Sequence, residues 1–209
     1  MNPFPLNPLP SRGRSVRRHW SRDFDGTELL VIMTAIGILA LIALPQVSYP
    51  NSKVDSAVQS LATTLYAAQR EAVTRQHDIA ISFDQAQRRA LLLYDVNGNG
   101  VADPGERIRL VTLDDAVAFG RGIAPARAIG AAAINFTHTV GGLPAVIFHR
   151  DGSASSGGGL YLTSNRAQAT GAYASDARAI ELVRATGRAE WWRYTGDGWI
   201  RDGTQQREK

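Results

Sequence analysis

The strongest constraint on this chain is one uncharged, apolar stretch near its N-terminus. Residues 29–44 read LLVIMTAIGILALIAL, with Thr34 and Gly37 as the least apolar positions. As a helix rising 1.5 Å per residue, this stretch is about 24 Å long, close to the ~30 Å hydrocarbon core of a bilayer. No Ala-x-Ala site follows it, as a secretory signal would require. We therefore expect the transmembrane half of a helix over residues 24–50.

The positive charge of the chain is concentrated before this stretch. The formal charge is +4, and residues 1–23 hold five arginines and one acid, so residues 24–209 sum to zero. A basic cluster before an apolar helix favours a cytoplasmic N-terminus. We expect the apolar stretch to cross a membrane once, with residues 1–23 on the cytoplasmic side. The five arginines are Arg12, Arg14, Arg17, Arg18 and Arg22.

Composition excludes several classes of site. The chain contains no cysteine, which rules out disulfides, thiolate metal ligands and a cysteine nucleophile. Apolar residues make up 44% and charged residues 20% of its 209 positions, which is typical of a folded domain. The net neutrality of residues 24–209 argues against a nucleic-acid partner.

An acid, Glu28, borders the apolar stretch, where a carboxylate is costly unless it finds a partner. The segment FDGTELLVIMTAIGILALIALP resembles the class III prepilin leader of type IV pilins and type II secretion pseudopilins. In that family a Phe follows the cleavage site, with Glu at the fifth mature position, often Gly at the fourteenth, and Pro at the twenty-second. Counted from Phe24, these positions are Glu28, Gly37 and Pro45.

This resemblance implies that residues 1–23 are a basic leader peptide and that the rest is a single-pass inner-membrane protein with a periplasmic globular domain. It also implies processing and assembly. A prepilin peptidase would cut between Asp23 and Phe24 and methylate the new amine. Glu28 would then pair with the Phe24 amine of a neighbouring subunit. This ion pair would fix the axial position of neighbouring helices, which apolar contacts alone leave undefined. Asp23 stands where the family has Gly, and Asp25 and Gly26 stand where it has Thr and Leu.

An amphipathic helix half follows over residues 51–76. Apolar residues recur there at spacings of 3 and 4, which defines one buried helix face. The members of this apolar stripe are Val54, Val58, Leu61, Leu65, Ala68 and Ala72.

From residue 77 to residue 203 the apolar period shifts toward two, with Gly, Pro, Asn and Asp between short runs. No helical connector separates these runs, which favours antiparallel pairing. The predicted fold is α+β: a long N-terminal helix packed on an antiparallel sheet in a β-sandwich-like domain, with a polar tail over 204–209. Strands are expected at 78–83, 90–95, 107–113, 116–119, 132–137, 145–149, 159–163, 179–184 and 188–194.

Several segments of this domain resemble the GspH/FimT branch of the family. They are LYAAQREAVTRQ, the Asn/Gly/Asp loop at 95–106, VIFHRDGSA, GGGLYLT and ELVRATGR, in that order, across residues 57–190. The resemblance implies a minor pseudopilin or minor pilin at or near the tip of a filament, which supports protein secretion or pilus assembly. Its partners would be other pilins, a prepilin peptidase and the inner membrane. The alternatives are a DNA-binding minor pilin of a transformation pilus and an anchored domain that never polymerises.

The loop DVNGNGVADPGE, residues 95–106, fits the calcium pattern D-x-[DN]-x-[DN]-G-x₅-E. Flanking strands replace the helices of an EF-hand, and three carboxylates would give an affinity near 10⁻⁴–10⁻³ M. The other interpretation is a hairpin turn built from Asn, Asp and Gly. Ca²⁺ is therefore one candidate cofactor, and no other is indicated. The candidate ligands are Asp95, Asn97, Asn99, Val101 through its carbonyl, Asp103 and Glu106.

The last predicted strand carries aromatic and basic residues that could contact single-stranded DNA. Related DNA-binding subunits use a Gly-Arg-x-Arg element, and here Glu190 replaces its second Arg. The competing interpretation places Trp191 and Trp192 on opposite strand faces, one in the core and one at a subunit contact. We favour the second interpretation. The candidate DNA contacts are Arg188, Trp191, Trp192, Arg193 and Arg201.

No pattern of catalytic residues indicates an enzyme. The four histidines show no metal-ligand spacing, and no Ser-His-Asp or paired-carboxylate arrangement is evident. The loop GSASSGGG, residues 152–159, matches neither a nucleophile elbow nor a phosphate loop. The histidines are His19, His77, His138 and His149.

Overall fold

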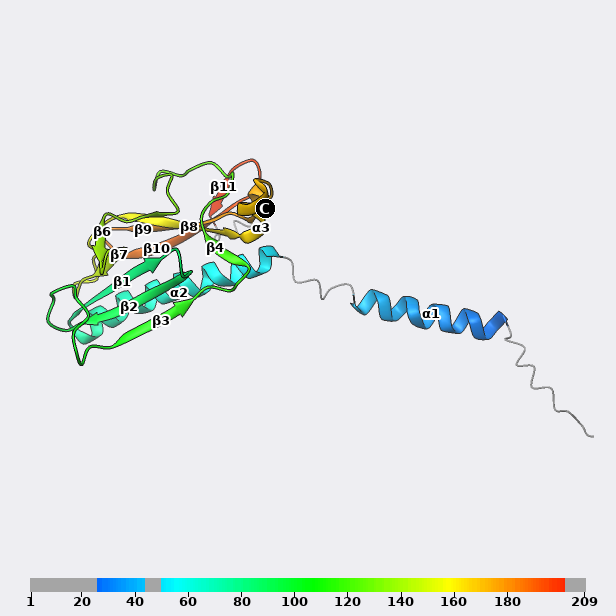
Figure 1. The fold of residues 1–209 in the computed structure, drawn as a ribbon, viewed down its shortest axis with the longest axis horizontal. Coiled ribbons are helices and arrows are strands. Elements are labelled where there is room, and N and C mark those ends of the chain that lie inside the picture. Colours follow the sequence, from blue (N-terminus) through cyan, green and yellow to red (C-terminus); the bar gives the residue numbers. More distant parts are fainter. Residues whose placement is uncertain (1–25, 44–49, 202–209) are drawn as a thin grey trace, which may run out of the picture. The chain divides into compact units, whose positions relative to one another are not determined.

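The computed structural model describes residues 26–43 and 50–201, with the side chains of residue 28 and residues 37–43 left out (Figure 1). Contacts divide the chain into two units, Met1–Val47 and Ser48–Lys209. Each unit is described by itself below. Residues 1–25, which include the predicted leader, and residues 44–49 and 202–209 lie outside the described residues.

The first unit contains helix α1, Gly26–Ala43. Its described apolar side chains are exposed: Leu30 is 65% and Met33 64% accessible. The Thr34 hydroxyl donates to the Leu30 carbonyl at 2.7 Å, so this polar group is satisfied within the helix. Among the described residues, none of the helices combines the length and apolar character needed to cross a bilayer.

The second unit begins with α2, Pro50–Arg75, and the predicted amphipathic helix is confirmed. Pro50 occupies the first helical position, where its missing N–H costs nothing. Every member of the predicted apolar stripe is buried, together with Thr64, whose hydroxyl donates to the Ser60 carbonyl at 2.8 Å. The 3.6-residue period therefore identified the face that packs on the sheets.

Eleven strands form two antiparallel sheets in the described chain (Figure 1). The first has the order β3-β2-β1-β7-β6, and the second β11-β10-β9-β8-β4, with β5 also paired to β8. The α+β prediction with antiparallel sheets is confirmed. The strands are β1 Asp78–Asp84, β2 Arg89–Asp95, β3 Ile108–Thr112, β4 Val117–Phe119, β5 Ile134–Asn135, β6 His138–Val140, β7 Leu143–Phe148, β8 Gly158–Ser164, β9 Arg178–Val183, β10 Arg188–Tyr194 and β11 Trp199–Arg201.

One core joins α2 to both sheets. The stripe of α2 packs with side chains of β1 and β7 from one sheet and of β8 and β9 from the other. Phe83 stacks on Phe136 with ring centroids 5.3 Å apart and meets Phe119 edge-on at 6.2 Å. Neither sheet buries its inner face without α2, so the helix belongs to the core of the domain.

The sequence analysis missed four short elements of secondary structure. Strands β6 and β11 have three residues each and bury none of them, unlike the equally short β4, in which Val117 and Phe119 are buried. The other two are helix α3, Asn165–Thr170, and the 3-10 turn η2, Ala174–Asp176. The segment predicted as a strand over 132–137 contains only the two residues of β5.

Polar contacts fasten α2 at both ends. Near its start, Asp55 pairs with Arg178, whose side chain is 2% exposed. Near its end, the Gln69 amide donates to the carbonyls of Gly152 and Thr186, which lie in turns of the two sheets. Gly187 has φ +59°, and a Cβ there would lie 2.5 Å from the Gly152 oxygen, so this turn requires glycine.

Asp176 links the stability of the domain to pH. Its fully buried carboxylate accepts from Arg166 Nε at 2.8 Å and from the Ser164 hydroxyl. Burial alone would raise the pKa of this carboxyl, but those hydrogen bonds and the charges of Arg166 and Arg178 outweigh burial and hold the pKa below its usual value. Such a carboxylate stabilises the fold above its unfolded-state pKa, and the contribution disappears as the pH falls through the lower folded-state value.

We expect Asp176→Asn to lower the free energy of unfolding at pH 7 and to flatten its decline below about pH 4. Urea unfolding at pH 7 and at a series of acidic pH values measures both effects. Asp115→Asn is the matched control, because the side chain of Asp115 is 98% exposed and loss of its charge should change the free energy of unfolding little. If the free energy of unfolding falls equally steeply with decreasing pH in wild type and in Asp176→Asn, this account is contradicted.

Candidate functional site

The residues predicted to act in assembly lie at the edge of what the structure describes. Asp23 and Phe24 fall outside the described residues, and so does the side chain of Glu28, although its backbone is part of α1. The predicted pair between Glu28 and the Phe24 amine of a neighbour therefore stays a prediction. The described part of α1 contributes an exposed apolar surface suited to helix packing.

The loop between β2 and β3 is organised by Asp95. This side chain is 4% exposed, and its two carboxylate oxygens accept backbone N–H groups from Gly98, Asn99 and Gly100 at 2.6, 3.1 and 2.7 Å. Gly98 and Gly100 both have positive φ, near 70°. The loop thus turns around one carboxylate, as the Asn/Asp/Gly turn interpretation requires.

The other candidate ligands close the same loop. The amide nitrogens of Asn97 and Asn99 donate to Asp103 Oδ2 at 2.7 and 2.6 Å. Glu106 accepts from the backbone N–H of Val96 at 2.9 Å and of Asp103 at 3.2 Å. Their oxygens are therefore directed at N–H groups within the loop.

Within residues 26–43 and 50–201, no three acidic or histidine side chains lie close enough together to hold a metal. Calcium binding at this loop stays a prediction from the sequence pattern. A rise in melting temperature with millimolar calcium that Glu106→Gln abolishes would support it. The absence of any rise would contradict it.

We expect Asp95→Ala to cost about 1–3 kcal/mol of unfolding free energy, because it removes the acceptor of three backbone N–H groups. Amide hydrogen exchange at Gly98, Asn99 and Gly100 should accelerate in the same variant. Asn99→Ala is the control, since it removes one exposed side chain and leaves those three bonds to Asp95 in place. Unchanged exchange at the three amides in Asp95→Ala would refute the assigned role.

The two tryptophans of β10 lie on opposite faces of the strand. Trp191 packs against the main core. Trp192 lies on the other face, under the guanidinium of Arg127, which is 3.7 Å from the ring centroid. The predicted split between the faces is confirmed, but Trp192 is covered by this chain's own Arg127 rather than left open.

Arg127 centres a cluster that the sequence analysis did not find. It forms an ion pair with Glu181 at 2.9 Å, and its backbone N–H donates to the Tyr161 hydroxyl at 2.7 Å. That hydroxyl donates to the Gly130 carbonyl at 2.8 Å, and Trp199 Nε1 donates to the Pro125 carbonyl at 3.1 Å. Burial raises the pKa of Tyr161. The loop that carries Arg127 is thereby fixed over the second sheet.

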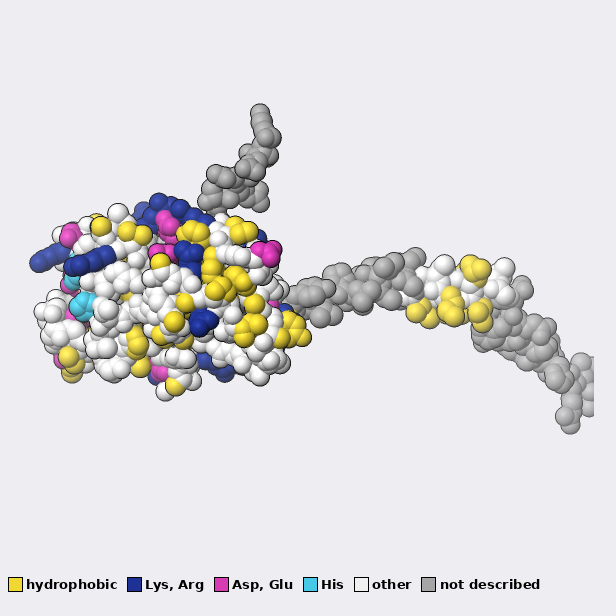
Figure 2. Space-filling model, turned by 90° about the horizontal axis from the view of Figure 1, so that it is seen from above, with side chains coloured by type: hydrophobic (Ala, Val, Ile, Leu, Met, Phe, Trp, Pro, Cys, Tyr) yellow, Lys and Arg dark blue, Asp and Glu magenta, His cyan; other side chains and the backbone are white. Residues whose placement is uncertain are grey.

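The candidate DNA contacts are largely engaged within the domain. Arg201 and Arg188 both pair with Glu190, whose side chain is 18% exposed. Arg193 is exposed and has no ion pair among the described residues. On the face seen in Figure 2, basic side chains are interspersed with acidic and hydrophobic ones.

We expect no salt-dependent binding of single-stranded DNA, because Glu190 holds two of the three arginines in ion pairs and Arg127 covers the Trp192 face. Fluorescence anisotropy with a labelled oligonucleotide at 20–200 mM salt measures this. Glu190→Gln is the informative companion variant, since it frees Arg188 and Arg201. Wild-type affinity that falls with salt and with Arg193→Ala would overturn the expectation.

His149 forms a pair that the sequence analysis missed, because Asp78 is far away in the chain. The His149 Nδ1 atom lies 2.9 Å from Asp78 Oδ2, where the end of β7 meets the start of β1. A surface pocket beside it has a volume of about 380 Å³ and includes Ser153 and Arg184. The Ser153 hydroxyl donates to Asp151 Oδ1 at 2.7 Å, so it is not directed at the imidazole as a nucleophile would be.

The globular domain matches a known protein family. The protein-family model described as "Type II transport protein GspH" matches residues 57–186, more than half of the chain. The matched range begins within α2 and includes both sheets up to the turn before β10.

Two individual proteins are similar to parts of this chain. The pilin-like protein PilA1 of Thermus thermophilus is 36% identical over 80 residues, which is 38% of this chain and 51% of that protein. The match thus spans about half the length of this curated relative. The second is the minor pseudopilin EpsH from the type 2 secretion system of Vibrio cholerae, whose structure is solved. The match covers 73% of this chain and 99% of the EpsH chain, at 13% sequence identity and a TM-score of 0.38.

Proposed function

Because this chain belongs to the GspH family, we propose that it is a minor pseudopilin or minor pilin that assembles into a filament through its N-terminal helix. The GspH match over residues 57–186 carries the proposal. The apolar stretch before that domain, with Glu28, Gly37 and Pro45 in pilin register behind a basic leader, supports it.

Two parts of the chain would divide the work of assembly. The exposed apolar side chains of α1 would pack against helices of neighbouring subunits, where dispersion contacts alone leave sliding along the axis nearly free. Glu28 would stop that sliding by pairing with the Phe24 amine of the next subunit in a low dielectric. The globular domain would remain outside the helix bundle and select partners. We place the subunit at or near the tip of a secretion pseudopilus or a pilus.

Leader cleavage is the first test of this proposal. We expect co-expression with a prepilin peptidase to remove residues 1–23 and add one methyl group, measured as intact mass. Asp23→Gly should be cut faster, because a small residue then precedes the scissile bond. If the peptidase cuts Asp23→Gly but leaves the wild-type chain uncut, an anchored, non-polymerising domain is favoured. If neither is cut, the filament proposal fails.

Glu28→Gln separates processing from assembly. We expect it to be cleaved like wild type but to be lost from the sheared filament fraction by roughly tenfold or more, since the register pair is gone. Asp25→Asn is the matched control, because it removes a neighbouring negative charge and leaves Glu28 intact. Equal incorporation of wild type and Glu28→Gln would rule out the proposed pair.

A further inference from the structure

Strand β10, Arg188–Tyr194, has a partner along only part of one side. On its other side it pairs with β9 over residues 188–193. At the edge of the sheet, β11 pairs only with residues 192–194 (Figure 1). In the part of the chain that the structure describes, residues 188–191 therefore form an open sheet edge. Such an edge presents unpaired N–H and C=O groups that can bind a further strand.

Two hydrogen bonds fix which backbone groups of β10 face this edge. The Tyr194 N–H donates to the Ala177 carbonyl at 3.1 Å, on the side of β9. The next N–H, of Thr195, donates at 3.0 Å to a carbonyl of the hairpin that leads into β11. Successive residues of a strand direct their backbone groups to opposite sides. The N–H and C=O groups of Ala189 and Trp191 therefore point to the open edge.

The chain itself leads to this edge. Strand β11 ends at Arg201, which lies opposite Trp192. Because each further step along one antiparallel strand opposes the preceding residue of the other, continuation of β11 would place residues 202–205 opposite residues 191 to 188. No loop has to close, so this segment has a much higher effective concentration at the edge than a strand of a separate chain. The residues that follow β11 in the sequence, 202–209, lie outside the described residues.

The outer face of this register has room for the segment. Side chains of directly opposite residues lie on the same face of a sheet. Arg201 forms its ion pair with Glu190 diagonally across that face. Residue 203 would lie opposite Glu190, beside this ion pair. It is a glycine, so it would add no side chain that could collide with the pair.

The inner face of the register matches in charge and size. Asp202 would lie opposite Trp191 and diagonal to Arg193, which is exposed and has no ion pair among the described residues. Diagonal neighbours are about 7–8 Å apart, within reach of a side chain as long as arginine. Thr204, a β-branched residue suited to strands, would lie opposite the small, half-buried Ala189 at the margin of the core. The segment would thus supply the carboxylate that Arg193 lacks.

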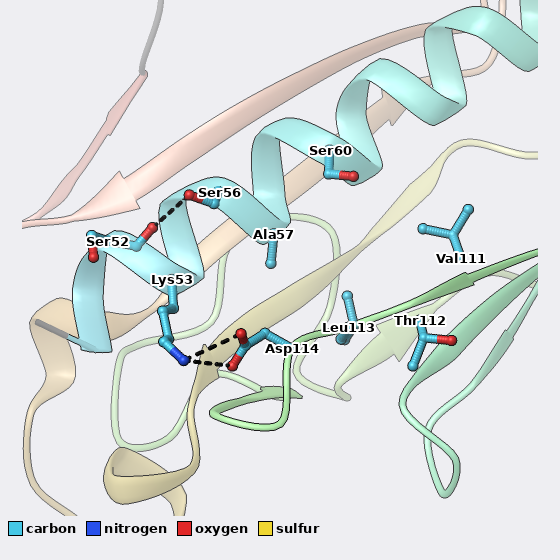
Figure 3. Close-up of a pocket in the computed structure, with 9 residues that line it drawn as sticks. All are labelled: Ser52, Lys53, Ser56, Ala57, Ser60, Val111, Thr112, Leu113 and Asp114. Atoms are coloured by element: carbon cyan, nitrogen blue, oxygen red, sulfur yellow. Dashed lines mark hydrogen bonds and ion pairs between the residues drawn. The ribbon is translucent and has the colours of Figure 1, made fainter. Parts of the chain in front are cut away.

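The open edge of the first sheet at β3 has no adjoining chain end. The chain enters β3 from the loop after β2 and continues toward β4. This edge carries the exposed Arg109 and adjoins a groove of about 330 Å³ against α2. Lys53 Nζ lies 3.2 Å from Asp114 Oδ1 across one end of the groove (Figure 3). Direct continuation of a strand is therefore available to the β10 edge and not to the β3 edge.

We propose that residues 202–205 continue β11 along β10, so that the chain's own C-terminal segment closes this edge of the second sheet. The N–H groups of Ala189 and Trp191 would donate to the carbonyls of residues 204 and 202, and Asp202 would pair with Arg193. A strand of another chain could then pair here only by displacing the segment. The proposal rests on the register of β10 and β11, so it does not depend on leader cleavage or on filament assembly.

Residue-resolved hydrogen exchange on the ¹⁵N-labelled full chain in detergent tests the proposal. We expect deletion of residues 202–209 to speed exchange at the amides of Ala189 and Trp191 by roughly tenfold, because their acceptors are lost. The amides of Glu190 and Trp192 face β9 and should stay equally protected, which reports that the domain remains folded. Unchanged exchange at Ala189 and Trp191 after the deletion would overturn the proposal.

Two proline variants at neighbouring positions test the register. Thr204→Pro removes an N–H that would donate to Ala189 and turns the ring toward β10, so it should speed exchange at Ala189 as the deletion does. Gln205→Pro removes an N–H that would point to solvent, so the protection should remain. Equal exchange at Ala189 in the two variants would overturn the proposal. Wild-type protection that grows with protein concentration would also overturn it, because a second copy would then occupy the edge.

Discussion

The domain depends on burial of one helix face. Two sheets converge on the stripe of α2, and each fully buried Val or Leu there contributes roughly 1.5–3 kcal/mol relative to an exposed side chain. Without α2, the inner side chains of β1 and β8 would lose their shared partner. The residues of α2 therefore close the core of the second unit. The chain cannot shorten α2 without opening its globular domain.

Buried charge sets where α2 sits along the sheets. Apolar packing tolerates a shift of one helical turn, but Asp55 can meet the buried Arg178 at only one position. Arg166 adds a second tie, since it contacts Asn51 at 3.3 Å while it pairs with Asp176. The polar groups thus specify the register that the hydrophobic stripe leaves open.

The sequence predicted the parts of this fold that have a strong period. The α2 stripe and seven longer strands, such as 78–83 and 188–194, were found because their apolar residues repeat over several turns or alternations. The short strands β6 and β11 bury none of their residues, so they lack the apolar alternation that identified the equally short β4. Of the site features, the turn at residues 95–106 was visible because its residues are adjacent. The Arg127 cluster and the His149–Asp78 pair were invisible, since residues 34–71 positions apart meet only in the folded chain.

The fastening of α2 at both ends has a mechanical consequence. If the helix is pulled along its axis, the load enters the domain through Asp55 near one end and Gln69 near the other, and Gln69 reaches turns of both sheets. The attachments then share the force in shear, so the helix must break several bonds together to slide. A subunit fastened in this way would transmit tension through its domain as a rigid link instead of unravelling strand by strand.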